Sequence, residues 1–178
     1  MLILGLTGHP ASGKDTVAEY LVSLGFDHFS TGDTIRAEMK REGLHTDRGS
    51  VRDFAAKKRK EHGLEYPIPK IIDKINKNTV VSGLRNVGEV KALEKAFGKE
   101  FTLVAVEAPV EVRYKRVLGR KRTGDEINFE QFKAEEDLER NRKGHAQEVD
   151  NVIAMADKVI LNDGTKRELV DKIKKLIK

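Results

Sequence analysis

The stretch that decides the fold is GHPASGKDT, residues 8–16. An apolar run typical of a β-strand, LILGL (2–6), precedes it, and the apolar residues that follow recur with helical spacing. Two glycines five positions apart and a lysine form the pattern G-x-x-x-x-G-K, in which backbone N–H groups and the following helix N-terminus hold phosphate oxygens. We therefore predict a phosphate-binding loop, with a glycine-rich turn and a solvated lysine as the alternative. The residues predicted to bind the phosphate-carrying cofactor are Gly8, His9, Pro10, Ala11, Ser12, Gly13, Lys14, Asp15 and Thr16.

Asp15 stands where this pattern usually has serine or threonine, whose hydroxyl binds magnesium. A carboxylate can also bind magnesium, directly or through water, and Thr16 can offer its hydroxyl to a phosphate one position later. Alternatively, Asp15 is an acid in the first turn of a helix that complements the helix dipole. Both interpretations of Asp15 stay open on the sequence.

The composition predicts a single soluble domain. The chain has 178 residues, of which 38% are hydrophobic and 35% charged, a length that suits one domain with a proper core. No apolar run approaches the roughly 20 residues of a membrane span, and LILGL is too short for a signal segment. The absence of cysteine excludes disulfides and thiolate metal sites and fits a reducing compartment. We expect a cytoplasmic protein without a membrane partner.

The charge balance points to an anionic partner. Lysine and arginine outnumber the acids by 34 to 29, which gives a formal net charge of +5. The one dense basic run, KKRK (57–60), has no aromatic residues between its charges. We interpret this run as a solvated helix face and do not expect specific nucleic-acid binding.

Apolar runs alternate with helical patterns along the chain, which predicts an α/β fold with a five-stranded parallel sheet covered on both faces. The predicted strands are LILGL (2–6), FDHFS (26–30), TVVSG (79–83), FTLVAVEA (101–108) and KVILN (158–162). Two segments interrupt the alternation: 33–77 holds about three helical patterns, and 121–144 is strongly polar. We expect one domain, 1–178, in which both segments stand beside the phosphate-binding loop at the carboxyl ends of strands.

Four further segments carry a family resemblance: TGDTIR (31–36), SGLRNVGEV (82–90), RVLGR (116–120) and ADKVILNDGT (156–165). With the loop at 8–16 they resemble adenylate kinases and related nucleoside monophosphate kinases. They are most similar to adenylate-kinase-like and dephospho-CoA-kinase-like P-loop proteins. The resemblance covers nearly the whole chain and implies ATP and Mg²⁺ as cofactors and transfer of the γ-phosphoryl group of ATP.

The resemblance also implies roles for individual residues. Segment 33–77 would bind the acceptor nucleotide, and 121–144 would be the lid over ATP. The implied acceptor-binding residues are Thr31, Gly32, Arg36, Gly83 and Arg85. The implied catalytic residues are Lys14, Asp33, Arg85, Arg116 and Arg120, with Arg122, Arg140 and Arg142 as further lid candidates. By the same analogy Asn162 and Gly164 would lie near the adenine. Because the aspartate that the family has before Gly83 is missing, we predict Asp15 and Asp33 as the metal ligands instead.

Elementary chemistry is consistent with several of these roles. An acceptor phosphate needs cations beside a triphosphate that repels it, and the guanidinium fork of Arg36 or Arg85 matches a phosphate. Arg116 and Arg120 share a helix face, where they would repel each other without a ligand or acids between them. Arg36 or Arg85 alone is more often a surface residue, but the two together, both beside strand carboxyl ends, favour phosphate binding. Asn162 with Gly164 could simply be an Asn-Asp-Gly turn before a helix.

Two departures from the family pattern concern activity. Ser82 precedes Gly83 where relatives have aspartate, and Glu136 stands where relatives have a lid arginine, for which Arg140 is the nearby substitute. A nucleotide-binding regulator or slow ATPase is therefore a rival hypothesis. The five histidines show no spacing typical of a metal site or triad, and we expect them to be surface groups.

The nature of the acceptor follows from residue 31. A hydroxyl acceptor, as in dephospho-CoA kinases, benefits from a carboxylate base, but Thr31 stands where such relatives have the first of two aspartates. A phosphate acceptor is already an anionic nucleophile and needs arginines more than a base. We therefore predict a nucleoside monophosphate acceptor, AMP first, with dephospho-CoA as the alternative.

Overall fold

A computed structural model describes residues 1–119, 128–140 and 148–177, and within them five parallel strands form one sheet in the order β2-β3-β1-β4-β5. Every predicted strand is confirmed to within one residue at each end. Buried apolar side chains line both faces of the central strands, as expected for a parallel sheet covered on both sides. The strands are β1 (Ile3–Thr7), β2 (Asp27–Ser30), β3 (Thr79–Ser82), β4 (Phe101–Glu107) and β5 (Lys158–Leu161).

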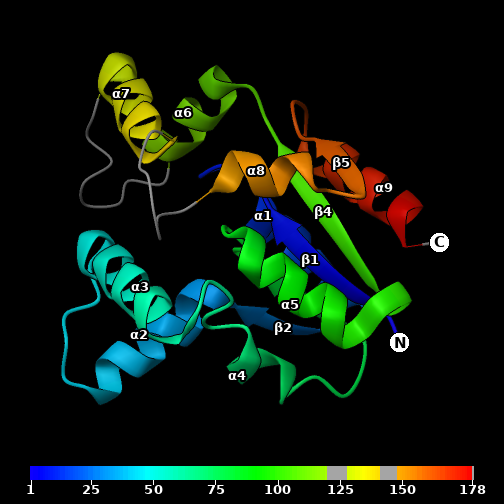
Figure 1. The fold of residues 1–178 in the computed structure, drawn as a ribbon. Helices are drawn as coiled ribbons and strands as arrows, with labels where there is room; N and C mark the ends of the chain where they lie inside the picture. Colours follow the sequence, from blue (N-terminus) through cyan, green and yellow to red (C-terminus); the bar gives the residue numbers. More distant parts are fainter. Residues whose placement is uncertain (120–127, 141–147, 178) are drawn as a thin grey trace.

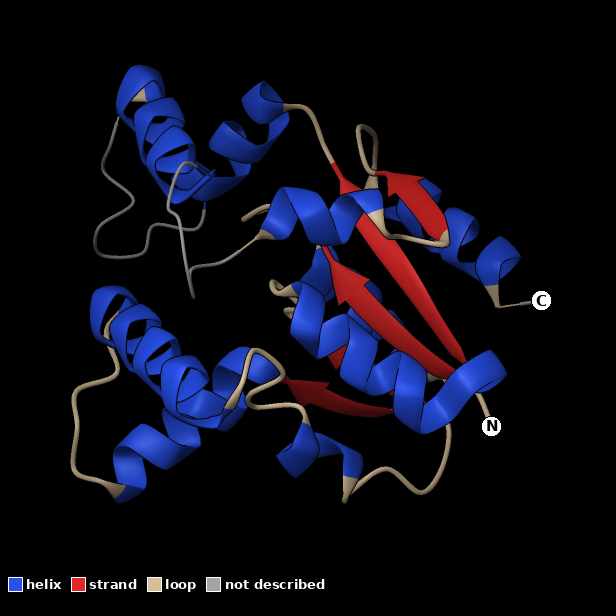
Figure 2. Ribbon diagram, in the orientation of Figure 1, coloured by secondary structure: helices blue, strands red, loops and turns tan. Residues whose placement is uncertain are grey.

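Helices cover the two faces of the sheet (Figures 1 and 2). On one face, α1 (Lys14–Ser23) and α9 (Lys166–Leu176) pack Leu21 and Ile173 against the strands. On the other face, α4 (Pro69–Ile72), α5 (Val87–Phe97) and α8 (Val149–Ala154) contribute to a second apolar cluster. A 3₁₀ turn, η1 (Gly98–Glu100), leads into β4. Val22 near the end of α1 is exposed.

Two helical segments stand at one end of the sheet in Figure 1. Helices α2 (Thr31–Arg41) and α3 (Arg48–His62) follow β2, and α6 (Val110–Gly119) and α7 (Phe129–Arg140) follow β4. Ser30 caps α2 by accepting from the Asp33 backbone N–H, so this helix begins directly at the end of β2. Because both segments follow the carboxyl ends of strands, they lie at the same end of the sheet as the loop after β1.

The strand register brings three chain segments to the same level. Ser82 in β3 pairs with Leu6 in β1 and with Ser30 in β2. The residues that follow these three positions therefore leave the sheet side by side. The chain continues from Leu6, Ser82 and Ser30 into the loop at 8–13, the segment at 83–86 and helix α2, respectively.

The basic run KKRK does not form a wholly solvated face. Arg59 is 4% exposed and donates a hydrogen bond to Glu89 of α5 over 2.8 Å. Lys58 lies 3.3 Å from Glu38 Oε1 and 3.4 Å from Glu42 Oε1. Our prediction was wrong for Arg59 because its side chain is buried in an ion pair with Glu89 of α5, whereas Lys57 and Lys60 are exposed as expected.

None of the helices in the described parts of the chain has the length and hydrophobicity needed to cross a membrane.

Candidate active site

The loop between β1 and α1 is held in a tight conformation. Gly8, Ala11 and Gly13 have positive φ angles of 136°, 61° and 106°. A Cβ atom at Gly8 would overlap the Val106 carbonyl of β4, and one at Gly13 would overlap the amide of Asn162. Both glycines are therefore required by close packing as well as by backbone angle.

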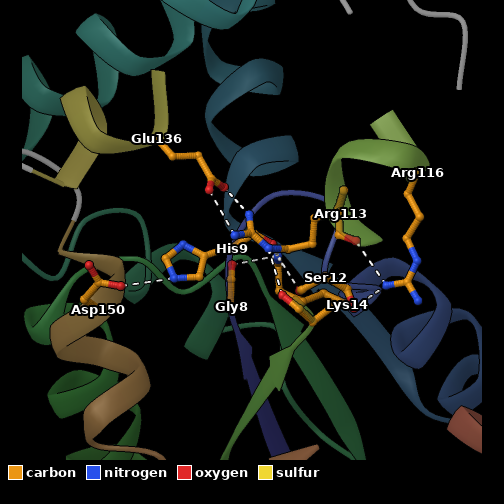
Figure 3. Close-up of polar contacts among 10 residues, drawn as sticks. Gly8, His9, Ser12, Lys14, Arg113, Arg116, Glu136 and Asp150 are labelled. Atoms are coloured by element: carbon orange, nitrogen blue, oxygen red, sulfur yellow. Dashed lines mark hydrogen bonds and ion pairs between the residues drawn. The ribbon is translucent and has the colours of Figure 1, made fainter. Parts of the chain in front are cut away.

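Lys14 reaches back across this loop. Its Nζ donates to the Gly8 and His9 carbonyls, each over 2.8 Å (Figure 3). Helix α1 begins at Lys14, and the residue before it, Gly13, has no side chain with which to cap the first turn. The first amides of α1, the loop and the ammonium group thus converge, which is the arrangement that binds an anion. Lys14 is partly buried and hydrogen-bonded, so the alternative of a solvated lysine does not describe it.

Arg116 and Asn162 hold the backbone of the loop at Ala11 and Ser12. The Arg116 guanidinium lies 3.4 Å from the Ala11 and Ser12 carbonyls and donates to the Asn162 carbonyl over 3.0 Å. The Asn162 side chain donates to the Ser12 carbonyl over 2.8 Å. Two residues predicted from sequence thus lie beside the loop, and both contact its backbone.

Gly164 has a structural role. A Cβ there would overlap the Glu168 carboxylate, which accepts from the Thr165 N–H and completes the capping box of α9. Gly164 thus lies in a turn before a helix, and its place near the adenine stays a prediction.

The predicted acceptor residues gather at the ends of β2 and β3. The Thr31 hydroxyl donates to the Gly83 carbonyl over 2.7 Å, and Gly83 has a φ of 82° with no room for a Cβ beside Thr31 Oγ1. Arg36 Nη1 donates to Asp33 Oδ1 over 2.8 Å, and both side chains are exposed. A Cβ at Gly32 would lie 3.2 Å from Arg36 Nη1, so the glycine leaves space for the guanidinium.

Arg85 lies just beyond β3 in the same region. Its N–H donates to Glu89 Oε2 and its carbonyl accepts from the Glu148 N–H, each over 2.7 Å. Its backbone position is thus determined from two sides. The remaining predicted arginines, Arg120, Arg122 and Arg142, lie outside the described residues, as does the side chain of Arg140.

The His28 imidazole in β2 is affected by two carboxylates. Burial lowers the pKa of His28, while the charges of Asp33 and Asp15 raise it. His28 Nε2 lies 2.8 Å from Ser82 Oγ. Ser82 at the end of β3 therefore has a histidine as its neighbour.

The donor set suits a weakly held magnesium ion. No cluster of three or more histidine or acidic residues able to hold a metal occurs in the described part of the chain. Magnesium sites commonly use one or two carboxylates with substrate phosphates and water. Asp15 and Asp33 stay the predicted carboxylates of such a site, in which the nucleotide would supply most oxygen ligands, and Asp33 Oδ1 also accepts from Arg36.

Three buried or partly buried pairs were not predicted. His9 Nε2 lies 3.1 Å from Asp150 Oδ1 of α8, and the His9 side chain is only 14% exposed, so the expectation that it is a surface group was wrong. Arg113 of α6 forms a bidentate pair with Glu136 of α7, which Figure 3 shows near the loop. Arg59 pairs with Glu89. The one local signal was the capping-box spacing of Asn86 and Glu89.

Comparison with known proteins agrees with this geometry. A family model described as an AAA domain matches residues 7–133. A UPF0200 protein from Pyrobaculum aerophilum is 37% identical over 90% of this chain and 87% of its own length. The chain belongs to the UPF0200 family. A relative from Archaeoglobus fulgidus, named a UPF0200/UPF0201 protein, is 34% identical over 99% of this chain, which spans only 55% of that relative.

Solved structures show the fold of this UPF0200 chain. TT1252 from Thermus thermophilus matches with a TM-score of 0.63 and 21% identity over 99% of this chain and 96% of its own. Shikimate kinase from Bacteroides thetaiotaomicron matches with a TM-score of 0.66 and 12% identity over 99% and 98%. The UPF0200 chain therefore has the α/β P-loop fold of shikimate-kinase-like proteins, and the predicted fold class is confirmed.

Proposed function

We propose that this chain is a magnesium-dependent phosphotransferase that moves the γ-phosphoryl group of ATP to a nucleoside monophosphate. The observation that carries the proposal is the pairing of Ser82 with both Leu6 and Ser30. It supports a donor site in the loop after β1 and an acceptor site at the ends of β3 and β2, on one edge of the sheet.

The chemistry needs little from side chains beyond charge and position. An acceptor phosphate oxygen bonds to the γ-phosphorus while the bond to the β–γ bridging oxygen breaks, and ADP leaves with that electron pair. No proton has to be removed from a phosphate acceptor near pH 7. Lys14 would offset charge on the transferred group, and Arg36 and Arg85 would offset charge on the acceptor.

A hydroxyl acceptor is the second candidate, and one observation favours it. The pKa of His28 is lowered by burial, which favours a neutral imidazole that can accept a proton. This imidazole lies 2.8 Å from Ser82 Oγ at the end of β3. Against it, the Thr31 hydroxyl and the Asp33 carboxylate are both engaged with neighbours.

The test is product identity with ATP and Mg²⁺ in excess over a panel of ribo- and deoxyribonucleoside monophosphates and dephospho-CoA. Formation of a nucleoside diphosphate, absent with the Lys14→Met variant, would support the proposal. Conversion of dephospho-CoA alone would transfer the assignment to the hydroxyl acceptor. ATP hydrolysis without transfer to any acceptor would favour the slow ATPase.

A further inference from the structure

Glu89 organises the chain where it leaves β3. Its Oε2 accepts hydrogen bonds from the Arg85 N–H over 2.7 Å and the Asn86 N–H over 3.1 Å. Asn86 caps α5, so one buried carboxylate sets both the first turn of this helix and the backbone at Arg85. Arg85 is the residue that the proposed function assigns to the acceptor.

Glu89 is itself held from the other side of the acceptor region. Arg59 of α3 donates from Nη2 to Glu89 Oε1 over 2.8 Å. The two side chains are 4% and 0% exposed, so water does not compensate this carboxylate. Removal of one partner from a buried ion pair leaves an uncompensated charge, which then seeks other partners or solvent. The geometry of Glu89 therefore depends on Arg59.

A second contact couples the same two helices. The residues just after α3 press on the first turn of α5, because a Cβ at Gly88 would lie 2.6 Å from Leu64 Cβ and 2.9 Å from the Glu65 nitrogen. Gly88 thus permits the close approach that brings Arg59 to Glu89. A displacement of α3 would be transmitted directly to the start of α5.

We propose that Arg59 is a positioning residue for Arg85, acting through Glu89, so that helix α3 sets the geometry of the acceptor site. The consequence for acceptor use rests on the proposed function, whereas the coupling itself does not. Arg59 touches no reacting group in this scheme. Its neighbour Lys60 carries the same charge on the same helix but is exposed, which makes it a matched control.

The experiment compares Arg59→Met with Lys60→Met in two measurements. Without any ligand, amide hydrogen exchange at Arg85 and Asn86 should be about tenfold or more faster in Arg59→Met than in wild type or Lys60→Met. With AMP as the probe acceptor, its KM should rise about tenfold, while the KM for ATP and kcat change by less than about threefold. A general loss of stability would instead affect both substrates alike.

Each outcome decides between the hypotheses. Unchanged exchange at Arg85 and Asn86 in Arg59→Met would overturn the coupling. Faster exchange with an unchanged KM for AMP in an active enzyme would overturn the role of Arg59 in positioning Arg85 for the acceptor. If wild type phosphorylates no monophosphate, the proposed function fails, and the exchange data still judge the coupling. Arg59→Lys serves if the methionine variant does not fold. Lysine keeps the positive charge on a shorter side chain, so the exchange rate at Arg85 and Asn86 and the KM for AMP should lie between those of wild type and those expected for Arg59→Met. Wild-type values in both measurements would refute the proposal.

Discussion

Arg113 and Glu136 form a bidentate ion pair between α6 and α7, with both side chains almost fully buried. Arg113 Nε also donates to the Ala108 carbonyl over 3.0 Å. Phe132, one helical turn before Glu136, packs against Ala11 of the phosphate-binding loop and Val117 of α6. Glu136 is therefore part of the contact that seats α7 beside the loop.

The first prediction concerns this pair. Arg113→Met should lower the free energy of unfolding by about 3 kcal/mol, because a carboxylate would remain buried without its partner. Glu136→Arg should be at least as harmful, because two guanidinium groups would then face each other. Thermal unfolding checks both, with the exposed Glu130→Gln as control. Wild-type stability of Glu136→Arg would show that α7 has another way to pack.

Lys14→Met should reduce phosphoryl transfer by at least about 100-fold, because a preorganised charge at the phosphates would be lost. The far-ultraviolet circular dichroism should match wild type, since Lys14 lies outside the core. Residual turnover near the wild-type rate would end the kinase hypothesis.

The metal prediction concerns Asp15, Asp33 and Ser82. Asp33→Asn or Asp15→Ala should raise the magnesium concentration needed for half-maximal rate, whereas Ser82→Asp should lower it by adding a carboxylate. The same order should appear in magnesium-dependent ATP binding. If both aspartate variants keep the wild-type magnesium dependence, other groups serve the metal.

Arg36→Ala and Arg85→Ala should each weaken acceptor use by about 1.5 to 3 kcal/mol while ATP binding is unchanged, because each removes a charge-assisted contact to the acceptor alone. Steady-state kinetics with the acceptor varied at saturating ATP measures this loss. Arg41→Ala, at the distant end of α2, provides a control of equal charge. An equal loss for ATP would contradict the assignment.

The last prediction is a pH dependence of stability from Glu38. Burial raises the pKa of this carboxyl, but hydrogen bonds from Lys70 and Tyr66 outweigh it and lower the pKa from its usual 4.5 to about 2. A lowered pKa contributes stability that is present above pH 4.5 and is lost as the pH falls through about 2. Glu38→Gln should thus be less stable than wild type at pH 6, with a difference that shrinks between these two values.

Urea unfolding of both proteins at pH 6, 4 and 2.5 measures this difference, with the exposed Glu42→Gln as control. A constant difference at all three pH values would mean that the charge of Glu38 contributes nothing.

The features that could be predicted from the sequence are those determined by residues close together in the chain. The strands appear as short apolar runs, and the spacing of the glycines in the loop at 8–16 is typical of a tight phosphate-binding turn. Arg113 with Glu136 and Arg59 with Glu89 could not be predicted, because ion pairs between residues 23 and 30 positions apart leave no local pattern. The run KKRK was misinterpreted for the same reason, since burial of one basic residue is decided by which helix packs on it.

His9 illustrates the limit at the site itself. Its place in the loop was predicted, but its partner Asp150 lies far along the chain on α8. Only the folded arrangement of the sheet and its covering helices brings the two together.

The two ends of the phosphate-binding loop are fitted against one half of the sheet, Gly8 against β4 and Gly13 against Asn162 after β5. The acceptor-side residues belong to the other half, at β2, β3 and α5. Mutations can therefore accumulate in α2 and α3 without disturbing the packing that shapes the loop. Under the proposed function, a lineage with this architecture would therefore be able to change its acceptor while it keeps its phosphoryl donor.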